Sequence, residues 1–192
     1  MPWETKFDIT TAVNNAAGVF WAKGYKSTSL NDLLGAMEIN KGSFYNTFGS
    51  KKNLFHKALL HYEQTHRVQL FQSVEEIDNP IDSISNIFDL FISSSTEDLN
   101  KKGCFIVNTA LELTSHGKEI NGIVQHAFNE VTNYFERQLK KGISMGVIAE
   151  PLDTEQTAQG LMALLISIRV MSRGALDKKG LEAIKSQAMR LF

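Results

Sequence analysis

The residues best suited to bind another molecule lie in the stretch NKGSFYNTFGSKKNLF, residues 40–55. A lysine such as Lys41 binds phosphate oxygens or the O6 and N7 atoms of guanine. Gly42 has no Cβ, so a phosphate can approach its backbone closely, and the free N–H groups at the start of a helix favour an anion. Tyr45 places a phenol at the end of a rigid side chain, which suits a phosphate or a thymine methyl group. Together these residue types indicate a surface that contacts DNA.

Two short helices are expected to position these side chains, over residues 29–37 and 40–48. The first opens with an S-x-x-D capping box, and Asn40 is a suitable N-cap for the second. Phe44 and Phe48 are four residues apart, so they share one helical face and can anchor it on other helices. The opposite face is short and polar. Two short helices joined by a tight turn predict a helix-turn-helix, whose second helix enters the major groove of DNA.

Apolar residues recur every three or four positions along most of the chain, which predicts an all-α fold. Only three prolines occur, and no β-hairpin dipeptide lies between alternating apolar runs. The expected helices are residues 9–23, 29–37 and 40–48, a longer helix from residue 50, one beyond residue 80, then 104–113, 120–139, 154–173 and one from residue 177, with a loop at 141–153.

The composition is that of a globular protein in a reducing compartment. The 192 residues are 43% apolar and 21% charged. The single cysteine, Cys104, excludes an internal disulfide and a cysteine-rich metal site. No secretory signal is visible, and the most apolar run is broken by Arg169 and is too short to span a bilayer. We therefore expect a soluble cytoplasmic protein with no membrane partner.

Charge is distributed unevenly along the chain. Residues 1–57 carry a net charge of +3, and the remainder carries −4. A basic N-terminal quarter is a weak indication of nucleic-acid contact. A DNA-packaging protein would need more positive charge than −1 overall and would not need a large apolar C-terminal lobe. A ligand-responsive regulator accounts for both parts of the chain.

No arrangement of residues typical of an enzyme occurs. His61 and His66 are five residues apart, so their imidazoles lie on different helical faces, and no H-E-x-x-H motif is present. The sequence also lacks a P-loop, a G-x-G-x-x-G motif and a nucleophile elbow. We expect no catalytic site, no metal and no cofactor.

The run GYKSTSLNDLLGAMEINKGSFYNTFGSKKNLFHKAL resembles the DNA-binding region of the tetracycline-repressor (TetR) family of bacterial transcriptional regulators. KGCFIVNTALEL, residues 102–113, is similar to a segment in the ligand domain of some members. Two features depart from the family pattern: Glu38 replaces the usual glycine of the turn, and no arginine precedes Arg67. The matching residues are Phe20, Gly24, Tyr25, Thr28, Ser29, Lys41, Gly42, Tyr45, Phe48, Ser50, Lys51 and Leu54.

The resemblance implies a three-helix DNA-binding domain in residues 1–50 and a helical ligand-binding and dimerisation domain in residues 51–192. The implied protein is a homodimeric repressor that leaves double-stranded operator DNA when a small-molecule inducer binds. Phosphate contacts are implied for Thr28, Tyr45 and Lys51. Base or phosphate contacts are implied for the polar residues of the second helix. The expected DNA-binding residues are Thr28, Ser29, Lys41, Gly42, Ser43, Tyr45, Asn46, Thr47 and Lys51.

The C-terminal lobe is rich in phenylalanine, and two interpretations of this stripe stay open. Aromatic residues at helical spacing are first of all core, but some can line an apolar ligand cavity beside a few polar partners. The resemblance favours a cavity. The candidate ligand-binding residues are Tyr62, Phe88, Phe91, Phe105, Asn108, Thr109, Glu112 and Phe128.

Cys104 allows a second mode of control. A thiol at the start of a helix, next to Lys101 and Lys102, is favoured as the thiolate and could sense oxidants or electrophiles. Free cysteine is also among the most buried residue types and commonly just fills space. The alternative function is therefore a regulator that responds to oxidants or electrophiles through Cys104.

The last two helices are expected to form the dimer interface. The segment TAQGLMALLISIRVMSRG, residues 157–174, is apolar around most of its circumference, more than one side of a monomer can bury. Ala158, Gly160 and Ala163 allow another helix to approach closely. Two such helices with their C-terminal neighbours would form a four-helix interface.

Overall fold

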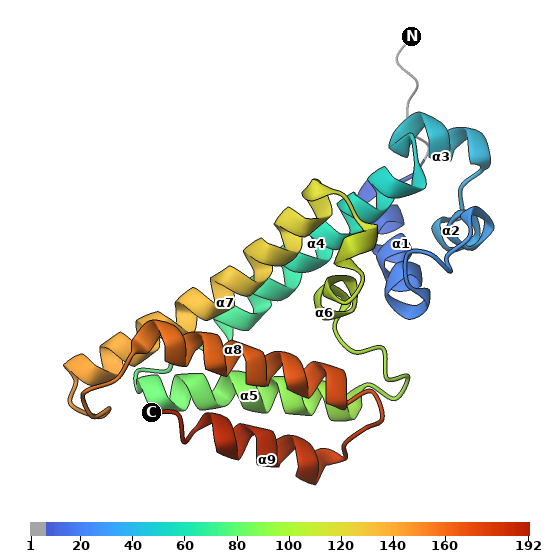
Figure 1. Ribbon diagram of the computed structural model, residues 1–192. Coiled ribbons are helices and arrows are strands. Elements are labelled where there is room, and N and C mark those ends of the chain that lie inside the picture. Colours follow the sequence, from blue (N-terminus) through green and yellow to red (C-terminus); the bar gives the residue numbers. More distant parts are fainter. Residues whose placement is uncertain (1–6) are drawn as a thin grey trace.

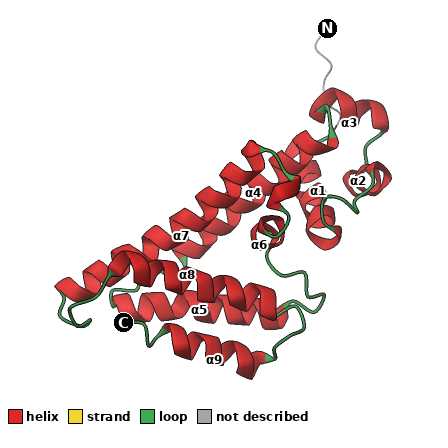
Figure 2. Cartoon of the chain, in the orientation of Figure 1, coloured by secondary structure: helices red, strands yellow, loops and turns green. Residues whose placement is uncertain are grey.

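The computed structural model describes residues 7–192, and within this range the fold is all-α, as the sequence predicts (Figures 1 and 2). Residues 1–6 lie outside the described part. The elements are α1 (Ile9–Lys23), α2 (Leu30–Met37), α3 (Lys41–Phe48), α4 (Lys51–Gln72), α5 (Pro80–Glu97), α6 (Phe105–Ala110), the 3₁₀ turn η1 (Leu113–Ser115), α7 (Lys118–Ser144), α8 (Thr154–Met171) and α9 (Lys178–Ala188).

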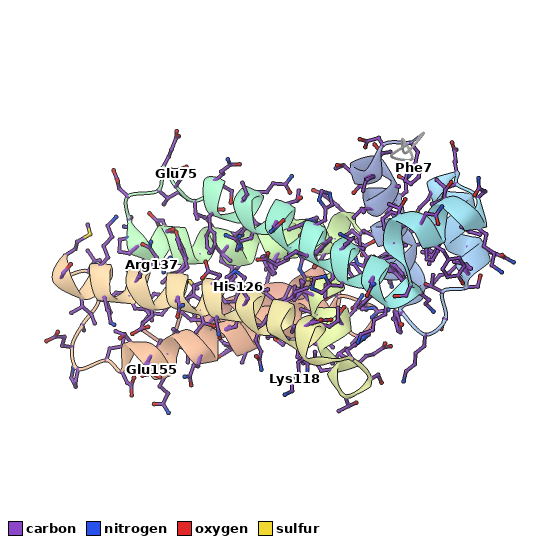
Figure 3. The ribbon with its side chains drawn as sticks, turned by 90° about the horizontal axis from the view of Figure 1, so that it is seen from above. Phe7, Glu75, Lys118, His126, Arg137 and Glu155 are labelled. Atoms are coloured by element: carbon purple, nitrogen blue, oxygen red, sulfur yellow. The ribbon has the colours of Figure 1, made fainter. Side chains whose placement is uncertain are left out.

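Helices α1, α2 and α3 gather at one end of the molecule and form its head (Figure 1). From the head, α4 and α7 run side by side toward the other end. The C-terminal body is completed by α5, α8 and α9, which pack on one another. Seen from above, Lys118 marks the end of α7 nearer the head and Arg137 lies toward the far end (Figure 3). The short helix α6 lies between the head and the body, in contact with α4, α7 and α8.

Side-chain caps fix where the helices of the head begin. Ser29 and Asp32 form the expected capping box at the start of α2. The side chains of Asn40 and Ser50 accept backbone N–H groups at the starts of α3 and α4. Each cap satisfies a donor that a helix start leaves without an intrahelical partner. These three predicted starts are confirmed because capping depends only on neighbouring residues.

Two hydrophobic cores hold the molecule together. The first joins the head to the first half of α4, to α6 and to the start of α7, with Phe20, Phe55 and Phe105 among its buried residues. The second lies among α5, α7, α8 and α9, around Phe88 and Phe135. The head therefore shares its core with helices that follow it by more than fifty residues, so it is packed firmly on the body.

Two helix ends differ from the sequence expectation. The helix expected at 104–113 ends at Ala110 and tightens into η1. The Thr109 hydroxyl donates to the Phe105 carbonyl at 2.8 Å, and such bonds back to the helix often bend it. Helix α7 continues to Ser144, into the expected loop, because Gly142 leaves room for the Ile148 side chain to pack directly on the helix.

The turn between α2 and α3 contains a residue in the left-handed backbone conformation, and this residue is Glu38 rather than a glycine. Glu38 has φ 54° and ψ 38°, and its N–H donates to the carbonyls of Leu34 and Gly35. A side chain with a Cβ is strained in this conformation by about 1–2 kcal/mol. The departure from the family pattern at Glu38 therefore leaves the turn intact at some cost in stability.

Replacing Glu38 by glycine should raise the free energy of unfolding by up to about 1 kcal/mol, because the strain of the Cβ is removed while the unfolded chain gains some freedom. Urea-induced unfolding followed by circular dichroism measures the difference. The matched control is Glu38→Ala, which removes the same charge but keeps the Cβ and should give no such gain. An equal gain in both variants would assign the effect to the charge and contradict the role of the backbone.

Candidate DNA interface and ligand cavity

Helix α3 presents one apolar and one polar face. Phe44 and Phe48 are buried against the rest of the head. On the other side Lys41, Gly42, Tyr45 and Asn46 are exposed, while Ser43 and Thr47 are half-buried. Tyr45 keeps 48% of its surface exposed. The predicted DNA-binding residues of this helix therefore share one accessible face.

The start of α3 leaves backbone donors available. The Asn40 carboxamide oxygen accepts the N–H of Ser43 at 2.8 Å, so the cap uses only one of the first N–H groups. A Cβ at position 42 would lie 3.2 Å from that same oxygen. Gly42 thus protects the cap as well as leaving the backbone open to a phosphate, a second role that the sequence did not indicate.

Lys51 stands at the start of α4, next to this surface. Its ammonium group lies 4.6 Å from the centre of the Tyr25 ring, within the range of a cation–π contact. Tyr25 in turn packs on Phe55 in the first core, at a centroid distance of 4.9 Å. The contact directs a flexible lysine, so its charge lies at a defined place beside α3.

Thr28 and Ser29 use their hydroxyls inside the protein. Thr28 is only 1% exposed, and its hydroxyl donates to the Gly24 carbonyl at 2.7 Å. The Ser29 hydroxyl bonds Asp32 in the capping box at 2.8 Å. The Lys23 ammonium, 2.6 Å from Asp32, and the bonds from Ser29 hold the pKa of the Asp32 carboxyl below its usual range. In this structure both hydroxyls hold the start of α2, and a direct DNA contact would require them to give up these bonds.

A cavity of about 290 Å³ lies inside the body, behind α6. Its inner wall is apolar, and its exposed rim carries polar residues of α4 and α5 such as His66, Gln69 and Ser94. The residues that line it are Tyr62, Glu63, His66, Arg67, Gln69, Leu70, Ser73, Leu90, Phe91, Ser94, Cys104, Ile106, Val107, Ala127, Phe128, Val131, Met162, Leu165, Ile166 and Arg169.

The cavity brings together only some of the candidate ligand-binding residues. Tyr62, Phe91 and Phe128 line it, as does Cys104. Phe88 does not: it is fully buried in the second core against Phe135. The remaining candidates, Phe105, Asn108, Thr109 and Glu112, line a second, smaller cavity of about 200 Å³ between α6 and the head.

Three charged residues of the cavity were not among the candidates. Glu63 and Arg67, one turn apart on α4, form an ion pair at 2.7 Å. Arg169 of α8 donates to the Ser95 hydroxyl at 3.0 Å and lies 4.2 Å from the centre of the Phe91 ring. Opposite charges four residues apart on a helix typically lie on the surface, so the sequence gives no sign that Glu63 and Arg67 line a cavity. An arginine that interrupts the most apolar run was a visible signal for Arg169.

Tyr62 and Cys104 form the polar contact nearest to α6. The Tyr62 hydroxyl donates to Cys104 Sγ at 3.9 Å. Burial, reinforced by the nearby cysteine, raises the pKa of the Tyr62 phenol well above its ordinary value. The phenol is therefore a neutral donor at physiological pH.

Helix α6 has one side on each cavity. Ile106 and Val107 line the larger cavity, while Phe105 and Thr109 line the smaller cavity next to the head. Just before α6, the carbonyl of Gly103 accepts a hydrogen bond of 3.1 Å from the Trp21 indole in α1. This bond connects the start of α6 to α1 and so to the head.

Within residues 7–192, no helix combines the length and hydropathy needed to cross a membrane. Across the same part of the chain, no three His, Cys, Asp or Glu side chains come together in a way that would hold a metal ion.

Two parts of the chain match known protein families. Residues 13–58 match the family described as "Bacterial regulatory proteins, tetR family". Residues 80–187 match "Tetracyclin repressor-like, C-terminal domain", and this match alone covers more than half of the chain.

Individual relatives agree with the family matches. YezE of Bacillus subtilis (strain 168), an uncharacterized HTH-type transcriptional regulator, is 30% identical over 136 residues, covering 71% of this chain and 64% of YezE, so less than two thirds of that relative's length is matched. ComR of Escherichia coli (strain K12), an HTH-type transcriptional repressor, is 26% identical over 97% of this chain and 89% of its own. A cysteine mutant of CifR, a TetR family transcriptional regulator solved with double-strand operator DNA, has a TM-score of 0.83 and 28% identity, covering 97% of this chain and 98% of that chain.

Replacing Trp21 by phenylalanine should lower the free energy of unfolding by about 1 kcal/mol, because the Gly103 carbonyl loses its donor while the aromatic packing on Tyr62 is kept. Urea-induced unfolding is followed by circular dichroism, since the change removes an indole fluorophore. Amide hydrogen exchange around Gly103 should speed up in the same variant. Unchanged stability and unchanged exchange would contradict the role of this bond in holding α6 on the head.

Proposed function

Since this chain belongs to the TetR family of bacterial transcriptional regulators, we propose that it is a homodimeric repressor that releases its operator when a small molecule occupies the cavity behind α6. Family membership makes it a helix-turn-helix regulator that binds operator DNA rather than an enzyme. The observation that carries the proposal is the position of α6, which contributes side chains to the ligand cavity and to the contact with the head.

Helix α3 is the part of the head that enters the major groove. Its accessible surface carries a charge, a phenol and three side-chain amide or hydroxyl groups, two of them half-buried, within one short helix. Lys41, Ser43, Tyr45, Asn46 and Thr47 contact bases or phosphates, and the free N–H groups at the helix start bind a phosphate. The structure of CifR with operator DNA supports this mode for a protein with the same fold.

Lys51 supplies a phosphate contact beside α3, with its amine directed by Tyr25. Thr28 and Ser29 act through the structure instead: their hydroxyls fix the start of α2. The division between the DNA-binding domain, residues 1–50, and the ligand-binding and dimerisation domain, residues 51–192, falls just before α4. That helix belongs to both, because its first half packs in the core of the head.

Dimerisation uses the side of α8 that the chain leaves uncovered, together with α9. Ala158, Leu161 and Leu165 are fully buried inside the chain, whereas Ala163 and Met171 are exposed. Ala163 is small enough for the α8 of a second copy to approach closely. Two copies joined in this way present two α3 helices to successive major grooves about 34–36 Å apart.

Release follows from linkage between the cavity and the head. A ligand that fills the cavity contacts Ile106 and Val107 of α6. It therefore stabilises a position of α6 that differs from the one in the DNA-bound protein. A ligand that binds the free form about 100-fold better than the DNA-bound form weakens DNA binding by about 2.7 kcal/mol.

A second mode of control is favoured by the position of Cys104 in the cavity wall. Its sulfur is half-buried in the cavity wall and accepts a hydrogen bond from Tyr62. An electrophile that enters the cavity would reach this thiol.

Cys104→Ser should then abolish release of operator DNA by iodoacetamide while leaving operator affinity unchanged. If iodoacetamide releases the wild type and Cys104→Ser from operator DNA equally, Cys104 is a packing residue and not a sensor.

Alanine at Lys41 or at Tyr45 should weaken binding to a duplex operator, selected from a random pool, by about 1–3 kcal/mol each without loss of stability. Fluorescence anisotropy measures the affinity. Lys51→Ala should weaken binding to all sequences alike and reduce the salt slope by about 1. Lys140→Ala is the control and should bind normally, because Lys140 follows Arg137, which lies toward the end of α7 away from the head (Figure 3). Full operator affinity in the Lys41, Tyr45 double variant would sink the assignment of α3.

Introducing an arginine at Ala163 should convert the dimer to monomers and reduce operator affinity at least tenfold, because a charged side chain then lies in the close helix contact. Analytical ultracentrifugation at micromolar concentration measures the mass. Gly122→Arg is a matched control, since that exposed position on α7 has open space around it. A wild-type chain that sediments as a monomer rules out the proposed interface.

A further inference from the structure

The ligand cavity contains an arginine whose charge no carboxylate balances. Among residues 7–192, no carboxylate oxygen lies within 4.0 Å of the Arg169 guanidinium. Of the described residues that line the cavity, Glu63 is the only acidic one, and it is already paired with Arg67. The cavity therefore holds two guanidinium groups and one carboxylate.

The other titratable side chains of the cavity do not alter this balance at neutral pH. The His66 residue is exposed, but its ring stacks on Tyr62 at a centroid distance of 3.8 Å. This partial desolvation, with a smaller contribution from the charge of Arg169, lowers the pKa of His66 and keeps its imidazole neutral. The Tyr62 phenol is neutral as well, because burial raises its pKa. Arg67, Arg169 and Glu63 together therefore leave the wall with one excess positive charge.

The Arg169 guanidinium carries more N–H donors than the protein uses. Nη1 donates to Ser95, and the face of the group rests on Phe91. Nε is buried and has no hydrogen-bond partner in the described chain. Because Nε is covered by protein atoms, the donors left for a ligand are those of Nη1 and Nη2, and two parallel N–H donors of a guanidinium match the two oxygens of a carboxylate.

Even a partly buried charge is costly in an apolar cavity unless a partner balances it. The side chains around Arg169 determine the polarity and size of the rest of the ligand. Phe91, Phe128, Val131 and Leu165 are among the apolar side chains of the wall, which offers few further polar groups. The volume of about 290 Å³ is at the lower end of the range for ligand pockets, about 300–1,000 Å³.

We infer that the inducer is a small monoanionic carboxylic acid with an apolar body, whose carboxylate pairs with Arg169 and whose hydrocarbon part fills the cavity. One excess charge selects a monoanion over a phosphate dianion, and the apolar wall selects a hydrocarbon chain or a single ring. The inference rests on the proposed function and specifies the chemical class of its ligand.

The test compares acids with neutral amides of the same shape. Octanoate and octanamide, and hydrocinnamate and hydrocinnamamide, are titrated into the full-length dimer by isothermal titration calorimetry. The wild type should bind each acid at least tenfold more tightly than its amide. In Arg169→Gln the ratio should fall to about one, mainly by loss of acid binding. Arg169→Lys keeps the positive charge but lacks the two parallel N–H donors of a guanidinium. Its ratio of acid to amide affinity should lie between the ratios of the wild type and Arg169→Gln.

Arg137→Gln is the control variant, because this exposed arginine on α7 does not line the cavity and should leave the ratio unchanged. Thermal unfolding without ligand separates a binding role from a structural one. Removing an unpaired charge should leave the melting temperature of Arg169→Gln unchanged or higher. If that variant does not fold, the wild-type ratio and Arg169→Lys still decide the question.

Equal affinity of acid and amide in the wild type, or no binding of either acid, overturns the inference. An acid preference that survives in Arg169→Gln overturns the assignment of Arg169. The operator assay separates this result from the proposed function. If the amides release operator DNA as well as the acids do, the regulatory role stands and the carboxylate inference fails. If an acid binds through Arg169 yet releases no DNA, the carboxylate site stands and the regulatory role fails.

Discussion

The packing of aromatic rings around Phe55 is the contact on which the rest of the structure depends. The Phe55 ring lies 5.0 Å from Phe20 of α1, 5.6 Å from Phe105 of α6 and 5.1 Å from His116 beyond η1. Such ring pairs contribute both buried area and preferred orientations. Because Phe55 belongs to α4, which also forms one wall of the cavity, this cluster fixes the head, α6 and the ligand site relative to one another.

The two kinds of buried polar group in the body show which ones stabilise the fold and which ones serve binding. Ser83 and Tyr134 are buried between α5 and α7, and their hydroxyls satisfy each other. A buried polar pair of this kind completes a core. Arg169 lines a cavity, where one nitrogen bonds Ser95 and another has no hydrogen-bond partner in the described chain. Polar groups that remain open in an apolar pocket are typical of ligand sites, where they set orientation and specificity.

The head divides its polar residues in a similar way. Thr28, Ser29 and Asn40 bond the backbone and fix the starts and the approach of α2 and α3. Lys41, Tyr45 and Asn46 extend from the exposed face of α3. A helix of only eight residues gains little stability from its own hydrogen bonds. It keeps its position because the caps and the buried Phe44 hold it, and this leaves the outer face free for DNA.

The sequence by itself determined the all-α fold, the helix-turn-helix and most helix starts. These features depend on local periodicity and on capping groups within four residues, as at Ser29, Asn40 and Ser50. Only the tertiary structure decided which side chains face the cavity. Phe88 and Phe91 lie one turn apart on α5, yet the first packs in the core and the second lines the cavity. The Glu63–Arg67 pair is local to α4, but its place in the cavity wall and the bond from Arg169 to Ser95 depend on where α4, α5 and α8 meet. Contacts between such distant segments leave no local pattern in the chain.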